Sequence, residues 1–444
     1  MVRSSLWLYS FLIVLVGSLF AAWHALAQDI WDEAAAASVN KELNRADLIE
    51  KGRYLSVAAD CKACHTAEGG SVYAGGRAMH VPLLGTLYSS NITSDIATGI
   101  GGWTLQEFER ALREGIGKDG RNLYPAMPYV SYAKITDEDI KALYAYFLFG
   151  VAPVHERPPA NKIPQLLSAR WPLYFWNLLF TPNKPFEPNP QKSDAWNRGA
   201  YLVQGPAHCG ECHTPRGLVF QAKAFDETKK GFLAGGPVLD GWEAYNITPD
   251  PIGGIGKWTA EQLTEYLQTG HVNRLAQAGG SMAEAIENSL ANMHDSDIAA
   301  IVTYLQDIPP VRGRVRMPRQ SLGNPATDVV ILRGNPLSRD IDPRKKADGA
   351  RLYLGFCATC HGVDGTGSKD GYYPSLIQNS TVGAKDDHNL RQAILEGISR
   401  TIDGEEKMMP GFADKMDEEQ LKRLVDYLRA QFAVPPRQTR EPNN

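Results

Sequence analysis

The spacing of apolar residues along the chain predicts short amphipathic helices, and the same pattern occurs three times. A helix is predicted over residues 104–115, because Phe108 and Leu112 lie about one turn apart on the same face. Thr104 and Glu107 are spaced as a capping box, and the final glycine suits a helix end. The corresponding segments are residues 259–270 and 390–397, which also end in glycine.

A second predicted helix closes each repeat and begins with acidic residues, which suit a helix N-terminus. It carries a tyrosine six residues after its first aligned aliphatic residue. Each repeat also opens on a glycine, and we expect the tyrosine-bearing helix to approach that glycine closely, because glycine has no side chain. The tyrosines are Tyr146, Tyr304 and Tyr427, and the glycines are Gly52, Gly199 and Gly349.

Proline-rich segments separate the repeats. Proline cannot continue a helix, so these segments are expected to act as semi-rigid spacers. The predicted fold is therefore all-α, with three tandem domains joined by linkers. The expected divisions are a first domain over residues 45–152, a linker over 153–192, a second domain over 193–310, a linker over 311–343 and a third domain over 344–434.

The N-terminus has the pattern of a secretory signal peptide. Arg3 precedes an apolar run over residues 6–23, and Ala25-Leu26-Ala27 follows, so residues 1–27 are predicted to be cleaved. The alternative is an uncleaved membrane anchor, since the run approaches the length that spans a bilayer. Both interpretations export the rest of the chain.

Composition narrows the function classes. The chain has 444 residues, of which 43% are apolar and 22% charged, as in soluble globular proteins of several domains. The net charge of −4 gives no reason to expect nucleic acid as a partner. The sequence has no G-x-G-x-x-G nucleotide-binding motif and no hydrolase nucleophile motif, so no substrate site is predicted on this chain.

All six cysteines fall into three C-x-x-C-H motifs, the sequence of c-type haem attachment. Two thiols at this spacing reach the two vinyl groups of one porphyrin, and the adjoining histidine gives a neutral imidazole to the iron. Three covalently bound haem c groups are therefore predicted. The attachment residues are Cys61, Cys64, Cys209, Cys212, Cys357 and Cys360, and the histidine ligands are His65, His213 and His361.

Other uses of cysteine fit this pattern poorly. A disulfide framework in an exported protein predicts no histidine after each pair. Zinc sites combine C-x-x-C with a second pair of ligands, and a thioredoxin-like redox pair would occur once. Three motifs with no cysteine left over favour haem.

The register of the repeats predicts the second axial ligand of each iron. A methionine lies twelve residues after the helix-ending glycine in every repeat. Single methionines usually fill cores, but three at one offset indicate a shared role. Histidine–methionine ligation raises the reduction potential and suits electron transfer. The predicted ligands are Met127, Met282 and Met409.

Several residues compete with these ligands. Met408 adjoins Met409, Met293 is the alternative to Met282, and Met79 lies before the middle helix. Four further histidines are assigned no ligand role, although the second of them directly precedes Cys209. They are His80, His208, His271 and His388.

Several motifs resemble those of the triheme cytochrome c subunits of bacterial membrane-bound dehydrogenases. That family includes flavin-dependent gluconate, fructose and sorbitol dehydrogenases and quinoprotein alcohol dehydrogenases. The resemblance covers nearly the whole mature chain. It is carried by residues 91–93 (Asn-Ile-Thr) with 101–103 (Gly-Gly-Trp), 124–129 (Tyr-Pro-Ala-Met-Pro-Tyr), 197–202 (Asn-Arg-Gly-Ala-Tyr-Leu), 212–217 (Cys-His-Thr-Pro-Arg-Gly) and 282–285 (Met-Ala-Glu-Ala).

The resemblance implies class I cytochrome c domains and a non-catalytic, electron-transferring role. It implies a partner subunit with FAD or PQQ that oxidises a sugar acid, sugar, polyol or alcohol, and a small third subunit. Electrons would pass through three haems to ubiquinone on the periplasmic side of the cytoplasmic membrane. Residues 246–250 favour a flavin partner of the gluconate dehydrogenase type.

Membrane attachment is expected to differ from that of relatives with an amphipathic C-terminal tail, because residues 437–444 are polar. Residues 166–180 are dense in aromatic and aliphatic side chains and are flanked by prolines. This composition suits a membrane interface or a partner-docking surface. The alternative is that the segment packs across the first two domains.

Three other functions remain open from the sequence. The chain is alternatively a cytochrome subunit of an aldehyde dehydrogenase or a molybdenum hydroxylase complex, or a free periplasmic electron shuttle. A haem peroxidase would need an open axial position on one iron.

Overall fold

The computed structural model describes residues 41–81, 84–182, 184–313, 315, 317–326 and 349–436. The predicted signal peptide and most of the predicted second linker lie outside those residues. The described chain is mostly helical, as predicted, and also contains four two-stranded antiparallel sheets that the sequence pattern did not predict. Their strands have only two to five residues, too few to show a clear alternation of apolar and polar positions. Within the described ranges, no helix is both long and apolar enough to cross a membrane.

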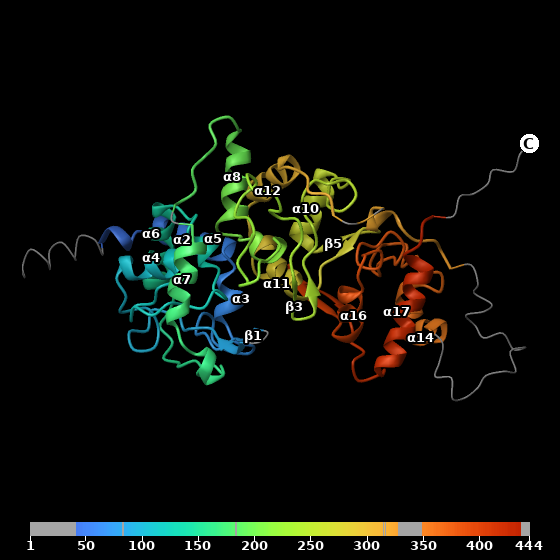
Figure 1. Cartoon of the computed structure of the whole chain (residues 1–444), viewed down its shortest axis with the longest axis horizontal. Coiled ribbons are helices and arrows are strands. Elements are labelled where there is room, and N and C mark those ends of the chain that lie inside the picture. Colours follow the sequence, from blue (N-terminus) through green and yellow to red (C-terminus); the bar gives the residue numbers. More distant parts are fainter. Residues whose placement is uncertain are drawn as a thin grey trace, which may run out of the picture.

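The described helices pack around three hydrophobic clusters that follow one another along the chain (Figure 1). We name the surrounding segments unit 1 (residues 41–151), unit 2 (residues 194–313) and unit 3 (residues 349–436). Unit 2 lies between the other two in Figure 1. Ala58 of unit 1 belongs to the cluster of unit 2, so the first two units share packed apolar surface.

Unit 1 consists of helices and a small hairpin. Thr104 caps α4 as predicted, because its hydroxyl accepts from the Glu107 amide while the Glu107 carboxylate accepts from the Thr104 amide. The elements are α2 (Ala46–Ala58), α3 (Cys61–His65), β1 (Ala78–Val81), β2 (Gly85–Tyr88), α4 (Leu105–Glu114), α5 (Tyr129–Tyr132), α6 (Asp137–Ala145) and a π-helical turn η1 (Tyr146–Gly150). The next segment holds a short turn η2 (Gln165–Leu167) and helix α7 (Trp171–Phe180).

Unit 2 repeats this order. Thr259 and Gln262 form the predicted capping box at the start of its middle helix. The elements are α8 (Asp194–Gln204), α9 (Gly210–His213), β3 (Val238–Leu239), β4 (Trp242–Glu243), α10 (Ala260–Thr269), β5 (His271–Val272), β6 (Ala276–Gln277), α11 (Gly280–Asn288), η3 (Leu290–Asn292) and α12 (Asp295–Asp307). A turn, η4 (Arg319–Ser321), follows.

In its described residues, unit 3 has a longer hairpin and no counterpart of α5 and α11. Its elements are α14 (Gly349–Phe356), α15 (Ala358–His361), α16 (His388–Leu395), β7 (Ile398–Ile402), β8 (Glu405–Met409) and α17 (Glu418–Phe432). The hairpin pairs Ile398 with Met409 at its open end.

In each unit the first and last helices cross at the predicted glycine. A methyl group on Gly52 would lie 1.9 Å from the Ala142 carbonyl oxygen and 2.7 Å from Cβ of Tyr146. The corresponding distances to the predicted tyrosine are 2.9 Å from Gly199 to Tyr304 and 2.5 Å from Gly349 to Tyr427. Any larger residue would force the helices apart, so the predicted close packing is confirmed in all three units.

Units 1 and 2 meet through a reciprocal pair of hydrogen bonds. The Tyr54 hydroxyl on α2 donates to the Asp297 carboxylate on α12, at 2.5 Å. In the opposite direction, the Tyr201 hydroxyl on α8 donates to the Asp139 carboxylate on α6. Each tyrosine lies two residues after the glycine at the helix crossing of its own unit, so equivalent positions of the repeat make equivalent contacts.

Each of these carboxylates also pairs with a cation of its own unit. Lys51 lies 2.6 Å from Asp139, and Arg198 binds Asp297 at 2.6 Å. The equivalence of the two sets gives the interface an approximate two-fold character. In unit 3 the positions of the tyrosine and the aspartate hold Arg351 and Gln420, so the reciprocal pair is specific to units 1 and 2.

Unit 3 joins unit 2 by a different contact. Arg400 on β7 is only 3% exposed and reaches into unit 2. Its guanidinium donates to the Thr269 carbonyl at 2.9 Å, the Ala278 carbonyl at 3.2 Å and the Gln277 side chain at 2.8 Å. The Asn389 side chain adds two hydrogen bonds to the backbone of Glu243. The Arg400 bonds attach the hairpin of unit 3 to the end of α10 and to β6, and the Asn389 bonds attach α16 to β4.

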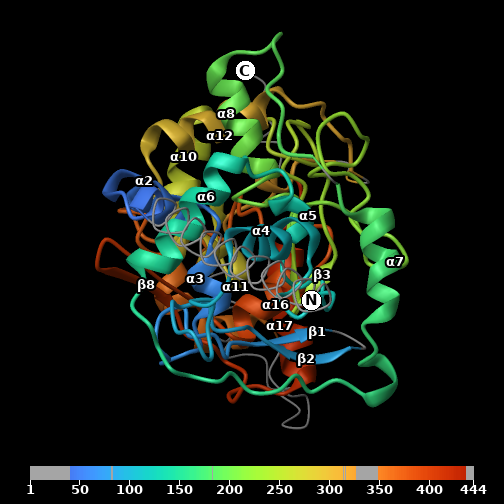
Figure 2. The ribbon, with the colours of Figure 1, turned by 90° about the vertical axis from the view of Figure 1, so that its left-hand side faces the viewer.

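Helix α7 lies along one edge of the molecule in Figure 2. The Trp176 indole donates to the Val219 carbonyl of the unit 2 side at 3.0 Å, and Asn177 donates to the Glu114 carbonyl of unit 1 at 3.0 Å. One face of the helix therefore packs across the first two units, which was one of the two alternatives predicted for residues 166–180. None of its residues is fully buried, and its outer face is exposed.

Candidate haem sites

Each C-x-x-C-H motif follows directly on the first helix of its unit. The motif histidines close α3, α9 and α15, and the short helix brings the two cysteines of each pair onto consecutive turns. None of the six cysteines is joined to another in a disulfide. Burial raises the pKa of the Cys209 and Cys357 thiols to about 12.

The three motif histidines share one hydrogen-bonding arrangement. Nδ1 of His65 contacts the Ser90 carbonyl oxygen at 2.7 Å, and Nδ1 of His213 contacts the Tyr245 carbonyl oxygen at 2.6 Å. In unit 3, Nδ1 of His361 contacts the Pro374 carbonyl oxygen at 2.8 Å. A carbonyl only accepts, so Nδ1 carries the proton and Nε2 is the free lone pair. This is the tautomer that a metal-binding histidine needs.

Burial also favours the neutral imidazole. Desolvation lowers the pKa of His65, His213 and His361, and it outweighs the opposing effect of the hydrogen bond to the carbonyl. A neutral ring with a free Nε2 binds iron, whereas a charged ring does not.

A side-chain turn fixes each accepting carbonyl, and sequence reasoning did not find it. Ser90 is followed by Asn91, whose Oδ1 accepts from the Thr93 amide at 2.9 Å. Tyr245 is followed by Asn246, which accepts from the Thr248 amide at 2.8 Å in the same way. Ser375 replaces the asparagine in unit 3, and its hydroxyl accepts from the Ile377 amide at 3.0 Å.

The two asparagines also donate hydrogen bonds to backbone carbonyls outside the turn. Asn91 Nδ2 donates to the Val154 carbonyl at 2.8 Å, and Asn246 Nδ2 donates to the Val311 carbonyl at 2.7 Å. Each asparagine therefore ties the chain that leaves the last helix to the loop that holds the histidine. The repeated Asn-Ile-Thr at residues 91–93 and 246–248 is the sequence signal for this turn. It was noted as a shared motif, but its structural role could not be read from the sequence.

The predicted methionines lie in different local structures, namely the turn before α5, the first turn of α11 and the end of β8. Met127 and Met282 are half-buried against the clusters of units 1 and 2, and Met409 is half-buried at the end of β8. Each follows its glycine through a turn or hairpin, and the glycines have the left-handed conformation that a helix end requires, with φ of 63°, 68° and 79° at Gly115, Gly270 and Gly397.

The competing methionines lie in different surroundings. Met293 is 6% exposed inside the cluster of unit 2, where it fills core space. Met408 is 65% exposed, and neighbouring positions on a strand point to opposite faces, so Met408 points away from the side that Met409 occupies. These placements favour the repeat register over both alternatives.

The donor set of each unit fits a covalently attached haem. Two thiols and a neutral imidazole with a free Nε2 come from the region of one short helix, and a half-buried methionine later in each unit is available as a thioether donor. Sulfur and imidazole are the protein ligands that c-type haem uses.

Comparison with known proteins agrees with this donor set. A family model for cytochrome c matches residues 49–148 and 346–431, which fall in units 1 and 3. The chain is 42% identical to the fructose dehydrogenase cytochrome subunit of Gluconobacter japonicus, over 86% of this chain and 79% of that protein. This chain belongs to the family of dehydrogenase cytochrome c subunits. Its members carry covalently bound haem c, and so does this cytochrome.

Two further relatives of this cytochrome are also named as cytochrome c subunits of dehydrogenases. The gluconate 2-dehydrogenase cytochrome c subunit of Pantoea cypripedii is 37% identical, over 89% of this chain and 88% of that protein. The cytochrome c subunit of the quinone-type alcohol dehydrogenase of Gluconacetobacter polyoxogenes is 39% identical, over 87% of this chain and 80% of that protein. The cytochrome subunits of three different dehydrogenases are therefore similar to this chain to about the same extent.

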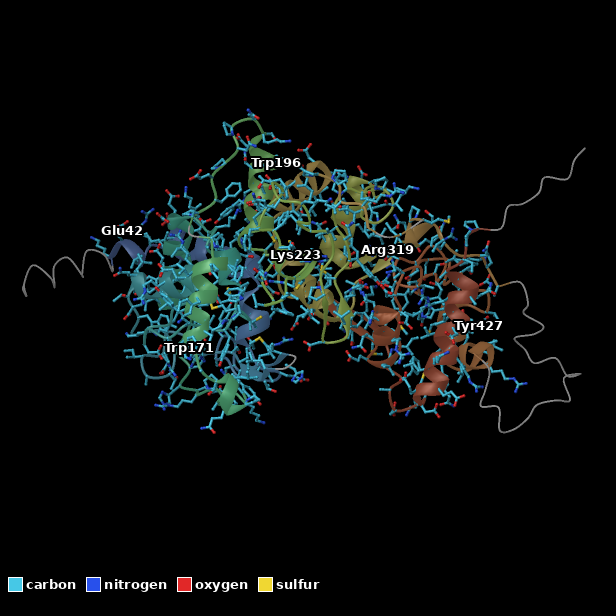
Figure 3. The ribbon with its side chains drawn as sticks, in the orientation of Figure 1. Glu42, Trp171, Trp196, Lys223, Arg319 and Tyr427 are labelled. Atoms are coloured by element: carbon cyan, nitrogen blue, oxygen red, sulfur yellow. The ribbon has the colours of Figure 1, made fainter. Side chains whose placement is uncertain are left out.

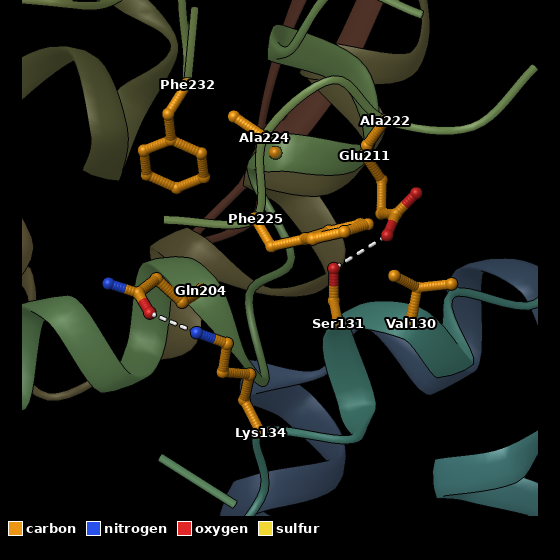
Figure 4. A pocket seen from close by; sticks show the side chains of 10 residues that line it. Val130, Ser131, Lys134, Gln204, Glu211, Ala222, Ala224, Phe225 and Phe232 are labelled. Atoms are coloured by element: carbon orange, nitrogen blue, oxygen red, sulfur yellow. Dashed lines mark hydrogen bonds between the residues drawn. The ribbon is translucent and has the colours of Figure 1, made fainter. Parts of the chain in front are cut away.

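In the cytochrome, the haem motifs of units 1 and 2 each contact the methionine segment of the other unit. Figure 4 shows Ser131, four residues after Met127, donating to Glu211 inside the second motif at 2.7 Å. Beside it, Lys134 donates to Gln204 at 3.0 Å.

The reverse contact involves the first motif. Arg77 donates to the Ala63 carbonyl inside that motif at 2.8 Å and forms a bidentate ion pair with Glu284 on α11. Met282 lies two residues before Glu284 on the same helix. The two motif helices and the two methionine segments are thus packed as one body.

Helix α11 also borders unit 3. A cavity of about 380 Å³ lies between α11 and the start of β7, with Trp242, Glu284, Glu287 and Ile398 among its lining residues. The Thr401 amide of β7 donates to Glu287 at 3.0 Å. The helix with Met282 therefore touches both neighbouring units.

Arg319 is a cation near the second site that sequence reasoning missed. Its guanidinium carbon lies 3.9 Å from the centroid of the Tyr245 ring, and burial lowers its pKa. It contributes to the lowered pKa of His213, after burial of the ring itself. Figure 3 shows Arg319 where units 2 and 3 meet. A cation at this place favours the reduced over the oxidised state of a nearby iron.

Proposed function

We propose that this chain is the electron-transferring cytochrome c subunit of a dehydrogenase complex on the periplasmic side of the cytoplasmic membrane. A catalytic subunit with FAD or PQQ would oxidise a sugar acid, sugar, polyol or alcohol, and a small third subunit would accompany it. Electrons would leave through this chain to ubiquinone. The family of dehydrogenase cytochrome subunits supports this proposal, and residues 246–250 favour a flavin partner.

We further propose three haem c groups, one in each unit. The observation that carries this is the repeated contact between histidine Nδ1 and a backbone carbonyl, present in unit 2 as in the two units that the family model matches. The domains would span residues 45–152, 193–310 and 344–434. The axial ligands would be His65 with Met127, His213 with Met282 and His361 with Met409.

A bound haem c supplies reversible one-electron exchange at its iron. The residues of this chain would orient the ligands of the iron. The Ser90, Tyr245 and Pro374 carbonyls hold each imidazole in one orientation and increase its basicity through Nδ1–H. The sulfurs of Met127, Met282 and Met409 would supply the second protein ligand to each iron, and an iron with both ligands in place would be less open to oxygen chemistry.

The arrangement of units gives unit 2 a central role. Hydrogen bonds join unit 2 to unit 1 at Tyr54 and Tyr201 and to unit 3 at Arg400. Electrons that pass between units 1 and 3 would cross the haem of unit 2. The proposal makes the three units a relay with the second as its middle step.

Purification from membranes tests the function. The chain is expected to co-purify with a larger flavoprotein or quinoprotein, and addition of the correct sugar or alcohol is expected to reduce its haems until ubiquinone reoxidises them. Isolation of the chain without a dehydrogenase, or haems that substrate does not reduce in the complex, would contradict the proposal.

A further inference from the structure

Helix α7 presents an apolar outer face. Its exposed side chains are 54–72% exposed and follow the spacing i, i+3, i+4, i+7, i+8, which places them on one side of a helix. They are Trp171, Tyr174, Phe175, Leu178 and Leu179. Trp171, at the start of this face, is labelled in Figure 3. The opposite face holds Trp176 and Asn177, which bind the body of the protein, so the apolar face is fixed outwards.

An exposed loop extends this surface. Leu218, Val219 and Phe220 have exposed fractions of 105%, 56% and 48% and stand at the tip of a tight loop closed by Arg216 and Ala222. The hydrogen bond from Trp176 to Val219 places the loop beside α7. Phe220 has the left-handed φ of 66°, which few bulky residues adopt, and it leaves the side chain half exposed. We name α7 together with residues 218–220 the apolar ridge.

The two segments that carry the apolar ridge have basic residues and no acidic ones in their sequence. Residues 157–186 contain Arg157, Lys162, Arg170 and Lys184 and no acidic residue, although the whole chain has a net charge of −4. Residues 212–225, around the loop, also contain two basic residues and no acidic one. Among these cations, Arg170 donates to the Asn122 carbonyl and lies over the Tyr124 ring, and Arg216 pairs with Glu211 at 2.7 Å.

We propose that the apolar ridge lies in the headgroup region of an anionic phospholipid bilayer and attaches this subunit to the membrane. This rests on the proposed function and names the surface by which that function reaches the membrane. Tryptophan, tyrosine and leucine on one helix face, carried by a segment with basic residues and no acidic ones, match the chemistry of that interface. A protein partner fits less well, because the outer face offers only the Trp171 N–H and the Tyr174 hydroxyl for specific hydrogen bonds.

Hydrogen–deuterium exchange on the purified wild-type holoprotein tests the proposal without a variant. Vesicles of phosphatidylcholine with a minor fraction of phosphatidylglycerol are the probe, and vesicles of phosphatidylcholine alone are the comparison. We expect slower exchange in residues 171–180 and 217–221 with the anionic vesicles and a weaker effect with the neutral ones. Unchanged exchange in both segments would overturn the proposal.

Flotation of variants with the same anionic vesicles gives a second test. The variant W171S/L178S/L179S is expected to lose about tenfold or more in vesicle partitioning, since each side chain buries several methylene-sized groups. The control V72S/I96S removes exposed apolar side chains of unit 1 outside the ridge and is expected to partition like the wild type. Equal partitioning of the ridge variant and the control would overturn the proposal.

Reduction by the catalytic subunit in detergent separates this inference from the proposed function. The ridge variant is expected to be reduced as fast as the wild type. A ridge variant that still binds vesicles but no longer binds the dehydrogenase would make the ridge a partner surface and overturn the proposal. Wild-type chain that binds vesicles through the ridge but is never reduced by a dehydrogenase would contradict the proposed function alone.

Discussion

At the scale of residues, the sites depend on short contacts repeated three times. Each motif histidine donates a hydrogen bond to a backbone carbonyl. The residue after that carbonyl is Asn91, Asn246 or Ser375, whose side chain forms a turn that holds the carbonyl in place. The proposed second ligand of each iron is a methionine that the register of the repeats identifies. Both sides of each iron can therefore be tested by single substitutions.

Replacing Met409 by leucine removes the proposed thioether while preserving volume. We expect a high-spin fraction in the absorption spectrum of the oxidised protein and the loss of one high-potential step in a redox titration, because leucine cannot bind iron. The matched control is Met408→Leu, which changes a residue that is 65% exposed. If the control shows the spectral change and Met409→Leu does not, the register assignment is wrong.

Replacing Asn246 by alanine tests the support of the second histidine. Without the side-chain turn, the Tyr245 carbonyl is expected to bind His213 Nδ1 less firmly, so the imidazole donates less to the iron and the reduction potential of one haem rises by tens of millivolts. Spectroelectrochemical titration measures this shift. Asn292→Ala, which removes a hydrogen bond to the Glu287 carbonyl at the surface, is the control and should leave all three potentials unchanged.

At the scale of elements, the helix crossing is the same in all three units, whereas the contacts between units differ from one pair to the next. The crossing of first and last helices depends on Gly52, Gly199 and Gly349, and it occurs in every unit. The tyrosine–aspartate pairs occur only between units 1 and 2, where both partners are present. Unit 3 is attached instead through the buried Arg400.

The reciprocal pairs predict equal and independent effects. Tyr54→Phe and Tyr201→Phe should each lower the free energy of unfolding by about 1–2 kcal/mol, because each leaves a partly buried carboxylate with one donor fewer. Denaturant unfolding of the holoprotein measures the change. Tyr373→Phe, at an exposed tyrosine of unit 3, serves as the control and should have almost no effect.

The same interface predicts a dependence on pH. Burial raises the pKa of the Asp297 carboxyl, but hydrogen bonds from Arg198 and Tyr54 outweigh it, and the net pKa is lowered. A group with a lowered pKa in the folded state stabilises fully above its unfolded pKa of about 3.9, and this contribution is lost as the pH falls through the folded pKa.

The difference in free energy of unfolding between the wild type and Asp297→Asn should therefore be constant above about pH 5 and shrink as the pH falls below about 4. Unfolding curves of both proteins over this range measure it. A difference that grows in acid would contradict the assignment of Asp297 as an ionised partner in the folded protein.

At the scale of the whole molecule, local features were predictable from the sequence and distant ones were not. The motifs, the capping boxes and the helix-ending glycines each depend on a few neighbouring residues, so the sequence predicted them. The carbonyls that orient the histidines lie 25, 32 and 13 residues from them, at no fixed offset, and the Tyr54–Asp297 bond joins residues 243 positions apart. Such contacts depend on the packing of complete units.

The central place of unit 2 predicts the result of removing its haem. In the variant C209A/C212A, the haems of units 1 and 3 are expected to remain, but transfer between them is expected to slow by orders of magnitude, because the middle step of the relay is lost. Stopped-flow absorption after substrate addition to the complex measures this. Unchanged transfer would contradict the relay order.

The central claim is that three haem groups are covalently attached, one to each C-x-x-C-H motif. Intact mass spectrometry of the denatured, purified holoprotein, followed by mapping of the peptides around Cys61, Cys209 and Cys357, tests it most directly. The account predicts a mass increment of three haem groups, with one on each motif peptide. An increment of two or fewer, or a motif peptide without haem in fully matured protein, would contradict it.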